Sequence, residues 1–184
     1  SLHDALPIYA AELQKMRKAC AISAAALKAG GEAIEPGITT AEIDKIIYDF
    51  IVRHGARPNF LHLYGFPATA CISVNDTVIH GIPNKQQQIR PGDIVSIDTG
   101  CKIDGFNGDN ACTYACGKID LEAQRLLDVT KESLHRGIEM ACGGNRVGDI
   151  GHAVQSYVEE NGFSVVRTFV GHGVGKELHE DPEV

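Results

Sequence analysis

An Asp-Gly dipeptide between two strand-like stretches constrains this chain more than any other feature. Asp104 and Gly105 lie within GDIVSIDTGCKIDGFNGDN, residues 92–110, after an apolar run. Asp-Gly favours a two-residue hairpin turn because both turn positions need a positive φ. The sequence therefore predicts a long antiparallel strand pair over residues 93–116.

Two aspartates occupy defined places in this predicted hairpin. A turn centred on Asp-Gly pairs Asp98 with Ala111 and Asp109 with Gly100. The two acids then lie on the same face as diagonal neighbours, about 7–8 Å apart at the backbone. Two converging carboxylates repel, so one must be protonated or a cation must lie between them. A divalent metal site is the economical interpretation. The alternative is that one acid caps a turn and the other points to solvent, because a one-residue bulge would reverse the faces.

Three histidines strengthen the metal interpretation. His80 lies in VIHGIP, His172 in FVGHGVG and His179 in ELHEDP, at expected strand ends beside glycines or acids. A single histidine is more often structural than functional. Glycines on both sides of His172, however, leave room for a metal ion or a substrate backbone. The remaining histidines considered lack such a setting and are interpreted as surface or structural: His54, His62, His135 and His152.

The order of predicted elements gives the fold class. Apolar positions three and four residues apart predict helices over residues 9–29, 39–54, 121–142 and 147–161. Thr39 and Glu42 form a capping box for the second helix. The stretch CISVNDTVIHGI predicts a tight hairpin, and SVVRTFVGHGVG, residues 164–175, predicts a return to strand. We expect an α+β domain with helices over one face of a mainly antiparallel sheet.

Composition excludes several classes of partner. A chain of 184 residues with 43% hydrophobic content suits one globular domain. The net charge of −7, with scattered Lys and Arg, provides no basic stripe for nucleic acid or an anionic membrane. No apolar stretch approaches the roughly 20 residues of a membrane span, and no secretory signal is evident, so cytoplasmic localisation is the default. The six cysteines lack CxxC spacing and are interpreted as reduced, mostly buried thiols: Cys20, Cys71, Cys101, Cys112, Cys116 and Cys142.

Three segments together resemble a known family. CISVNDTVIHGIP, GDIVSIDTGCKIDGFNGD and GHGVGKELHEDPEV resemble the type I methionine aminopeptidases, pita-bread metalloproteases of peptidase family M24, and the resemblance covers residues 10–184. It implies a pita-bread (creatinase/aminopeptidase) fold, with an antiparallel sheet covered by helices and an incomplete second half. It also implies metal-dependent removal of the N-terminal methionine from nascent proteins by hydrolysis of the first peptide bond. Residues 80–83 and 105–109 resemble the type I branch, because type II enzymes, prolidases and aminopeptidases P carry different residues there.

The resemblance also implies roles for individual residues. Two divalent metal ions (Co, Mn, Fe or Zn) would be held by two aspartates, one histidine and two glutamates, and the matching ligands are Asp98, Asp109 and His172. His80 matches the catalytic histidine near the substrate amine and scissile amide, and His179 the one that steadies the carbonyl and the tetrahedral intermediate. The methionine pocket would include Phe60, Leu63, Phe66, Cys71 and Leu178, with His80 and His179 at its substrate-binding edge. Leu63 and Phe66 stand where some relatives carry tyrosine, so the pocket's shape should differ from theirs.

The ends of the chain carry expectations of their own. Residues 1–8 are interpreted as an extension that is not native protein, because SLHDALPI has no initiator Met and no periodicity leading into the next helix. Residues 9–184 are interpreted as a methionine aminopeptidase catalytic domain without its C-terminal part, because the resemblance puts the two glutamates beyond Val184. We therefore expect this fragment alone to be inactive.

The expected partners are few, and two other functions stay open. We expect the N-terminal Met of nascent polypeptides as substrate, the ribosome as a candidate partner, no nucleic acid, no membrane and a monomer at full length. One alternative is a non-catalytic pita-bread module that binds protein, although such modules typically lack the aspartates or histidines present here. The other is an Xaa-Pro aminopeptidase or prolidase-type hydrolase on the same fold.

Overall fold

The computed structural model describes residues 8–184. All but Ile8 of the expected extension over residues 1–8 therefore lies outside the described residues. The described chain divides into two compact units. We call residues 8–119 and 174–178 the sheet unit, and residues 120–173 and 179–184 the helical unit.

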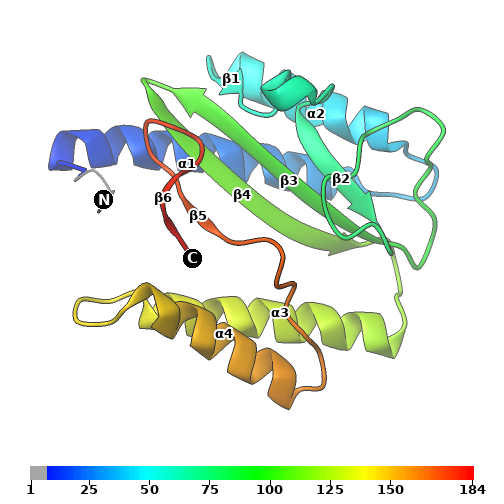
Figure 1. The fold of residues 1–184 in the computed structure, drawn as a ribbon. Coiled ribbons are helices and arrows are strands. Elements are labelled where there is room, and N and C mark those ends of the chain that lie inside the picture. Colours follow the sequence, from blue (N-terminus) through cyan, green and yellow to red (C-terminus); the bar gives the residue numbers. More distant parts are fainter. Residues whose placement is uncertain (1–7) are drawn as a thin grey trace. The chain divides into compact units, whose positions relative to one another are not determined.

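A four-stranded antiparallel sheet forms the middle of the sheet unit (Figure 1). Strand β4 (Phe106–Ala115) pairs along the full length of β3 (Ile94–Ile103). Because a strand has two edges, β2 (Ala70–Val74) and the short β1 (Arg57–Pro58) share the other edge of β3. The predicted hairpin is confirmed, since β3 and β4 meet at Asp104 and Gly105 with φ values of 53° and 84°.

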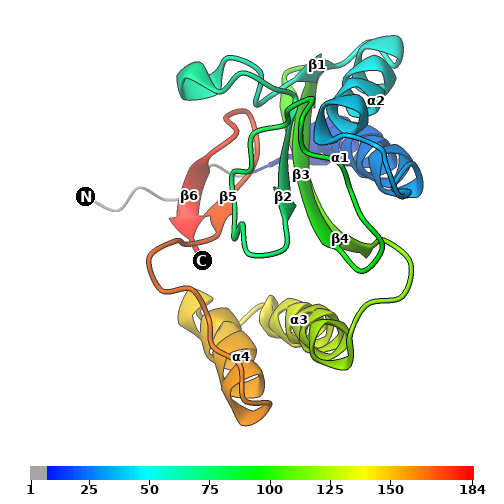
Figure 2. The same ribbon diagram turned by 90° about the vertical axis from the view of Figure 1, so that its right-hand side faces the viewer.

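The two faces of this sheet have different neighbours. Side chains alternate along each strand, so every second residue faces the same way. One face carries Ile72, Val95 and Ile97, which form a buried core with side chains of α1 (Ala10–Glu32) and α2 (Thr40–Arg53). Figure 2 shows both helices along one side of the sheet. The other face is more polar, and its residues include Cys71, Ser73, Ser96, Asp98, Asn107 and Asp109.

The first helix is longer than predicted. The Gly-Gly pair at its end predicts a stop near residue 29, yet α1 continues to Glu32. The glycines serve packing instead: a Cβ on Gly31 would collide with the ring of Tyr114, and one on Gly30 would lie 2.7 Å from Ile47 Cδ1. Small residues let the helix approach both neighbours closely, and this tertiary requirement outweighs their low helix propensity.

Polar contacts fix the second helix. The capping box is confirmed, because the Glu42 amide donates to Thr39 Oγ1 at 3.2 Å and the Thr39 amide donates to Glu42 Oε2 at 2.9 Å. Further along α2, the Asp44 carboxylate accepts from the amides of Thr69 and Ala70 at 2.9 and 2.8 Å. The helix is thereby tied to the first residue of β2.

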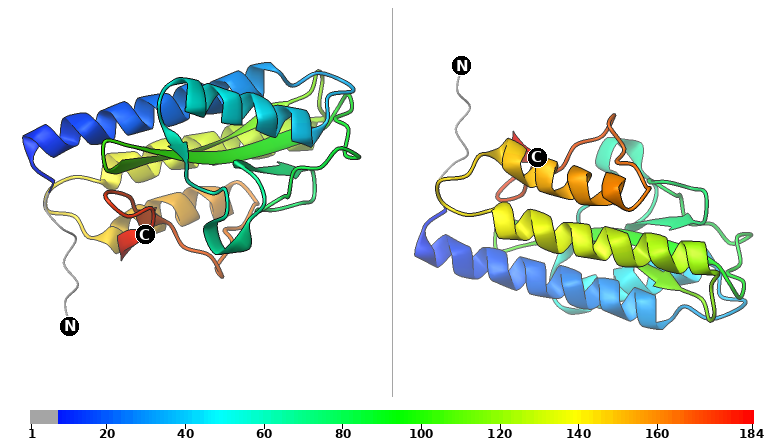
Figure 3. Two further views of the ribbon diagram at one scale, coloured as in Figure 1. Left: turned by 90° about the horizontal axis from the view of Figure 1, so that it is seen from above. Right: turned by 90° about the horizontal axis from the view of Figure 1, so that it is seen from below.

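The helical unit contains the other two predicted helices. They are α3 (Leu121–Met140) and α4 (Val147–Glu160), which lie side by side (Figure 3). The Asp120 carboxylate caps α3 by accepting from the Ala123 amide at 2.7 Å. The Arg136 guanidinium lies 3.9 Å from the centroid of the Tyr157 ring and links the two helices.

The predicted return to strand over residues 164–175 is largely wrong. Among those residues, only β5 (His172–Gly173) is a strand, and it pairs with β6 (Glu180–Glu183) through an irregular register. Apolar and β-branched residues favour a strand only where an edge is available for pairing. The exchange of backbone hydrogen bonds between Gly171 and Val184 extends this short pairing by one step.

Two expectations from composition can be compared with the structure. Within residues 8–184, each helix is too short or too polar to cross a membrane. All six cysteines are free thiols, but only Cys71, Cys101 and Cys116 are buried, and Cys112 and Cys142 are exposed. The expectation of mostly buried thiols is therefore only half right.

Candidate functional site

The two aspartates lie on the polar face of the sheet, in neighbouring strands. Asp98 of β3 faces Ala111, and Asp109 of β4 faces Gly100, which is the predicted register. No bulge interrupts the pairing of β3 and β4, so the reversal of faces that would favour one acid capping a turn and the other pointing to solvent does not occur. Both acids are half-buried. The residues opposite them, Ala111 and Gly100, have a small side chain and no side chain, respectively.

The negative charge of Asp98 and Asp109 affects the thiol of Cys71 in the neighbouring strand β2. Cys71 of β2 lies directly opposite Asp98 of β3 on the same face of the sheet. Burial raises the pKa of the Cys71 thiol to about 12, and the negative charges of Asp98 and Asp109 contribute to this shift. Burial also raises the pKa of Cys20, with a smaller contribution from Asp109. Both thiols are therefore neutral near pH 7, and the aspartates create a negative potential that attracts cations.

His80 lies in the segment that follows β2 and returns beside it. Its backbone has a φ of 57°, in the left-handed region, and the carbonyl of the next residue, Gly81, accepts from the amide of Ile72 at 2.9 Å. Ile72 follows Cys71 in β2. In the sheet unit, the segment with His80 therefore lies beside β2, which carries Cys71, and β2 in turn pairs with β3, which carries Asp98.

The predicted pocket residues of the sheet unit come from three segments. Phe60 is buried and follows Asn59, whose amide donates to the Gly100 carbonyl at 3.0 Å. Leu63 and Phe66 are half-buried and lie in and after the short 3-10 helix η1 (Leu63–Gly65). Leu178 is half-buried and ends the segment 174–178.

A buried amide attaches this last segment to the hairpin. Asn107 of β4 has an exposed fraction of 2%, and its Nδ2 donates to the carbonyls of Gly175 and Lys176, both at 2.9 Å. The Asn107 backbone amide donates to the Gly175 carbonyl as well, and Lys102 Nζ donates to the Lys176 carbonyl at 2.6 Å. The sequence did not predict these contacts of Asn107, because its partners lie nearly 70 residues away and no local pattern marks them.

His172 and His179 belong to the helical unit. Their ring centroids lie 4.4 Å apart in an edge-to-face arrangement. His172 Nδ1 lies 3.0 Å from the Gly173 carbonyl. When Nδ1 carries the proton it donates to this carbonyl, and Nε2 then presents its lone pair, as metal-binding histidines do.

The donor types fit a divalent metal ion. Carboxylate and imidazole ligands suit Mn, Fe, Co and Zn, and Asp98 and Asp109 contribute two carboxylates to one face of the hairpin. Within residues 8–184, however, no group of three or more His, Cys, Asp or Glu side chains is gathered closely enough to hold a metal. The structure brings the two aspartates together, and the assignment of His172 as a third ligand stays a prediction.

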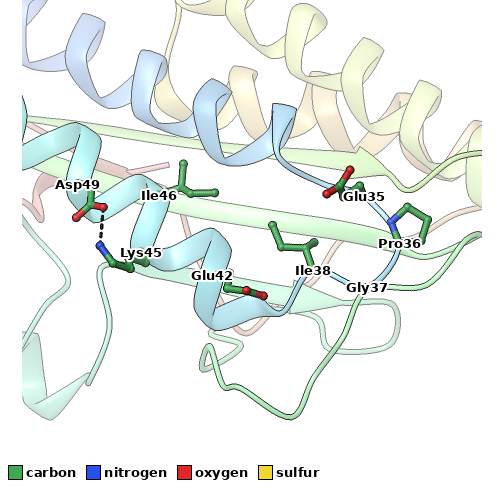
Figure 4. A pocket seen from close by; sticks show the side chains of 8 residues that line it. All are labelled: Glu35, Pro36, Gly37, Ile38, Glu42, Lys45, Ile46 and Asp49. Carbon is green, nitrogen blue, oxygen red and sulfur yellow. Dashed lines mark hydrogen bonds and ion pairs between the residues drawn. The ribbon is translucent and has the colours of Figure 1, made fainter.

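A separate surface pocket of about 500 Å³ lies where α1 connects to α2 (Figure 4). Its lining contains none of the predicted site residues: it consists of Glu35, Pro36, Gly37, Ile38, Glu42, Lys45, Ile46 and Asp49. Lys45 and Asp49 form an ion pair at 2.6 Å, and Glu42 belongs to the capping box of α2. Because the lining contains none of the predicted site residues, and because Glu42, Lys45 and Asp49 already have partners, this pocket is not the candidate site.

Comparisons with known proteins cover almost the whole chain. Metallopeptidase family M24 matches residues 14–184. A methionine aminopeptidase of Clostridium perfringens is 53% identical over 173 residues, which are 94% of this chain and 69% of that protein. The crystal structure of a methionine aminopeptidase from Thermotoga maritima superposes with a TM-score of 0.94 at 39% identity, covering 97% of this chain and 72% of the other. A prolidase from Pyrococcus furiosus superposes with a TM-score of 0.84 at 24% identity, covering 95% and 50%, which shows a shared fold only.

Proposed function

We propose that this chain, which belongs to metallopeptidase family M24 and within it to the methionine aminopeptidases, serves to remove the N-terminal methionine of proteins by hydrolysing the first peptide bond. The position of Asp98 and Asp109 on one face of the β3–β4 hairpin, in neighbouring strands, is the observation that carries this proposal. Two carboxylates in adjacent strands, each opposite a small residue, provide the start of a metal site where the family requires one.

We infer that two divalent metal ions bind at this site. Asp98 and Asp109 would hold them from the sheet, and His172 would contribute an imidazole. Such ions lower the pKa of a water molecule and stabilise negative charge on a reacting carbonyl oxygen. Carboxylate and imidazole donors suit Co, Mn, Fe and Zn alike, so we propose that metal availability in the cell decides which of these ions is bound.

The other predicted residues bind and orient the substrate in this proposal. His80 lies next to the strand that carries Cys71 and hydrogen-bonds the substrate near its amine and scissile amide. His179 hydrogen-bonds the carbonyl. The neutral Cys71 thiol gives the pocket an uncharged wall beside Asp98, which suits an apolar methionine side chain. The remaining pocket residues are Phe60, Leu63, Phe66 and Leu178.

The proposed activity also implies a domain, a cellular location and partners. We propose that residues 9–184 are part of one catalytic domain, working in the cytoplasm on the N-terminal Met of nascent polypeptides. The ribosome is the candidate macromolecular partner, and the full-length protein is proposed to be a monomer. The net charge of −7 supports the view that nucleic acid is not a direct partner.

A comparison of substrates and of two carboxylate variants tests the proposal. The chain spans 69% of the Clostridium perfringens relative, so the assays use the full-length protein. We expect release of Met from a Met-Ala-Ser peptide and not from an Xaa-Pro peptide. Asp109→Asn should remove bound metal and Met release together, because a neutral amide is a much weaker ligand than a carboxylate.

Asp104→Asn is the matched control for the loss of one carboxylate. Asp104 is exposed, lies in the turn of the same hairpin and pairs with Lys18 at 2.7 Å. Asn suits this turn position as well as Asp does, so metal content and turnover should persist. Full metal content and turnover in Asp109→Asn would contradict the metal site. Preferred cleavage of Xaa-Pro would favour a prolidase-type hydrolase, and a metal-free inactive protein would favour a protein-binding module.

A further inference from the structure

The segment that carries His80 departs from the predicted hairpin. A regular two-residue hairpin after β2 would pair Ile79 with Ile72. Instead, the Ile72 amide donates to the Gly81 carbonyl at 2.9 Å, so the returning segment holds two additional residues. His80, immediately before Gly81, adopts a φ of 57°. Histidine is one of the residues that tolerate this left-handed conformation, but it needs fixed neighbours to persist.

Gly81 is held at both of its backbone groups. Its carbonyl accepts from Ile72, as above, and its amide donates to the hydroxyl oxygen of Ser73 at 3.0 Å. A Cβ on Gly81 would collide with the Ile72 carbonyl oxygen and would lie 2.8 Å from the Ser73 Cα. The glycine therefore lies directly against the backbone of β2, and a side-chain hydroxyl supplies the bond that a strand ladder would normally supply.

Ser73 is buried and close in sequence to the candidate site. Its exposed fraction is 4%. It lies two residues after Cys71 in β2, on the same polar face, and Cys71 faces Asp98. Ser73, which accepts the hydrogen bond from the Gly81 amide, is thus part of β2, the strand that pairs with β3 beside Asp98. His80 itself is exposed.

We propose that Ser73 is a positioning residue for His80: its hydroxyl fixes the Gly81 amide and so holds the His80 backbone in the orientation that the reaction needs. This inference rests on the proposed function, because it assigns His80 a role in catalysis. Ser73 does not touch the substrate in this proposal. It acts through one backbone amide and one histidine.

A double-mutant cycle tests this coupling in the full-length protein. Ser73→Ala should lower kcat for Met-Ala-Ser about tenfold to a hundredfold, because a shift of His80 by up to about 1 Å costs this much in rate. KM should stay within about twofold. In a His80→Ala background, Ser73→Ala should change kcat by less than about twofold. Ser73→Thr retains the hydroxyl acceptor and should retain most of the activity.

Hydrogen exchange supplies a readout that is independent of turnover. Ser73→Ala frees the Gly81 amide, so exchange in residues 79–82 should accelerate by about tenfold, the equilibrium effect of losing one hydrogen bond. Ser133→Ala is the matched control, because Ser133 has an exposed fraction of 5% and its hydroxyl donates to the Thr130 carbonyl within α3. It should affect thermal stability similarly but leave kcat and exchange in residues 79–82 unchanged.

Failure of the coupling and failure of the proposed function give different results. An equal loss of kcat on Ser73→Ala with and without His80 would overturn the positioning role, as would unchanged exchange in residues 79–82. If His80→Ala itself left kcat intact, the assigned role of His80 would be wrong, while accelerated exchange in Ser73→Ala would still support the Ser73–Gly81 contact.

Discussion

Replacing Asn107 should distinguish hydrogen bonding from packing at the hairpin. Its amide donates two hydrogen bonds of 2.9 Å to the carbonyls of Gly175 and Lys176, and the side chain is almost fully buried. Asn107→Ala removes both bonds, each contributing about 1 kcal/mol to stability. Neither carbonyl is left without a donor, because the Asn107 backbone amide and Lys102 Nζ still reach them. We therefore expect Asn107→Ala to lower the free energy of unfolding by about 2–3 kcal/mol, including the lost packing.

Asn107→Asp preserves the volume and reverses the chemistry. An ionised carboxylate cannot donate, so the oxygen that replaces Nδ2 would face the carbonyl oxygens of Gly175 and Lys176 with no hydrogen between them, in a buried site. The loss should exceed that of Asn107→Ala and reach about 4 kcal/mol. Urea unfolding at pH 7 measures both values, with midpoints lowered by about 1 M for Ala and more for Asp.

Which of the two Asn107 variants loses more stability distinguishes hydrogen bonding from packing. If packing alone mattered, the isosteric Asp would be tolerated better than Ala, and that result would refute the hydrogen-bond reasoning. Asn145 is the control, since it is exposed and also donates to a backbone carbonyl, that of Met140 at 3.0 Å. Its Ala and Asp variants should each change stability by less than about 0.5 kcal/mol.

Two further predictions concern close packing and thiol chemistry. Gly108→Ala would place a Cβ 2.5 Å from the backbone of Ala19 in α1, so it should cost about 1–3 kcal/mol in urea unfolding. Gly148→Ala in α4, where nothing lies within 4 Å, should be neutral or stabilising, and equal losses in the two variants would contradict the packing argument. Cys71, with a pKa raised to about 12, should resist iodoacetamide at pH 8 in the native protein while the exposed Cys112 reacts. Its labelling rate should rise about tenfold per pH unit towards pH 12 as thiolate forms, and mass spectrometry showing equal rates at pH 8 would contradict this.

Local signals predicted those parts of the fold in which neighbouring residues decide the conformation. Asp104-Gly105 specifies a turn, and the turn fixes the register that places Asp98 and Asp109 on one face. The capping box at Thr39 and Glu42 likewise involves residues only three apart. In both cases the interacting groups are close in sequence, so the pattern contains the physical cause.

Where tertiary contacts decide, the sequence pattern misled or was silent. Gly31 reads as a helix breaker, but its place against the ring of Tyr114 keeps it inside α1. The apolar residues 164–171 favour a strand that the described chain does not form. Ser73 carried no signal as a partner of Gly81, because an ordinary serine in a strand pattern does not reveal which amide its hydroxyl will meet.

The irregular segments of the sheet unit need polar anchors for a physical reason. Residues 79–82 and 174–178 lie against the sheet without forming strands of it, so no regular ladder satisfies their backbone groups. Buried side chains on the polar face supply the missing partners. The Ser73 hydroxyl accepts from the Gly81 amide, and the Asn107 amide donates to the carbonyls at 175 and 176. A backbone bonded to one defined atom has fewer alternative positions than one packed against apolar surface, because hydrogen bonds are directional and hydrophobic contacts are not. The polar face therefore anchors the backbone next to His80, at Gly81, and the backbone two residues before Leu178, at Lys176, while the opposite face packs against α1 and α2 in the hydrophobic core.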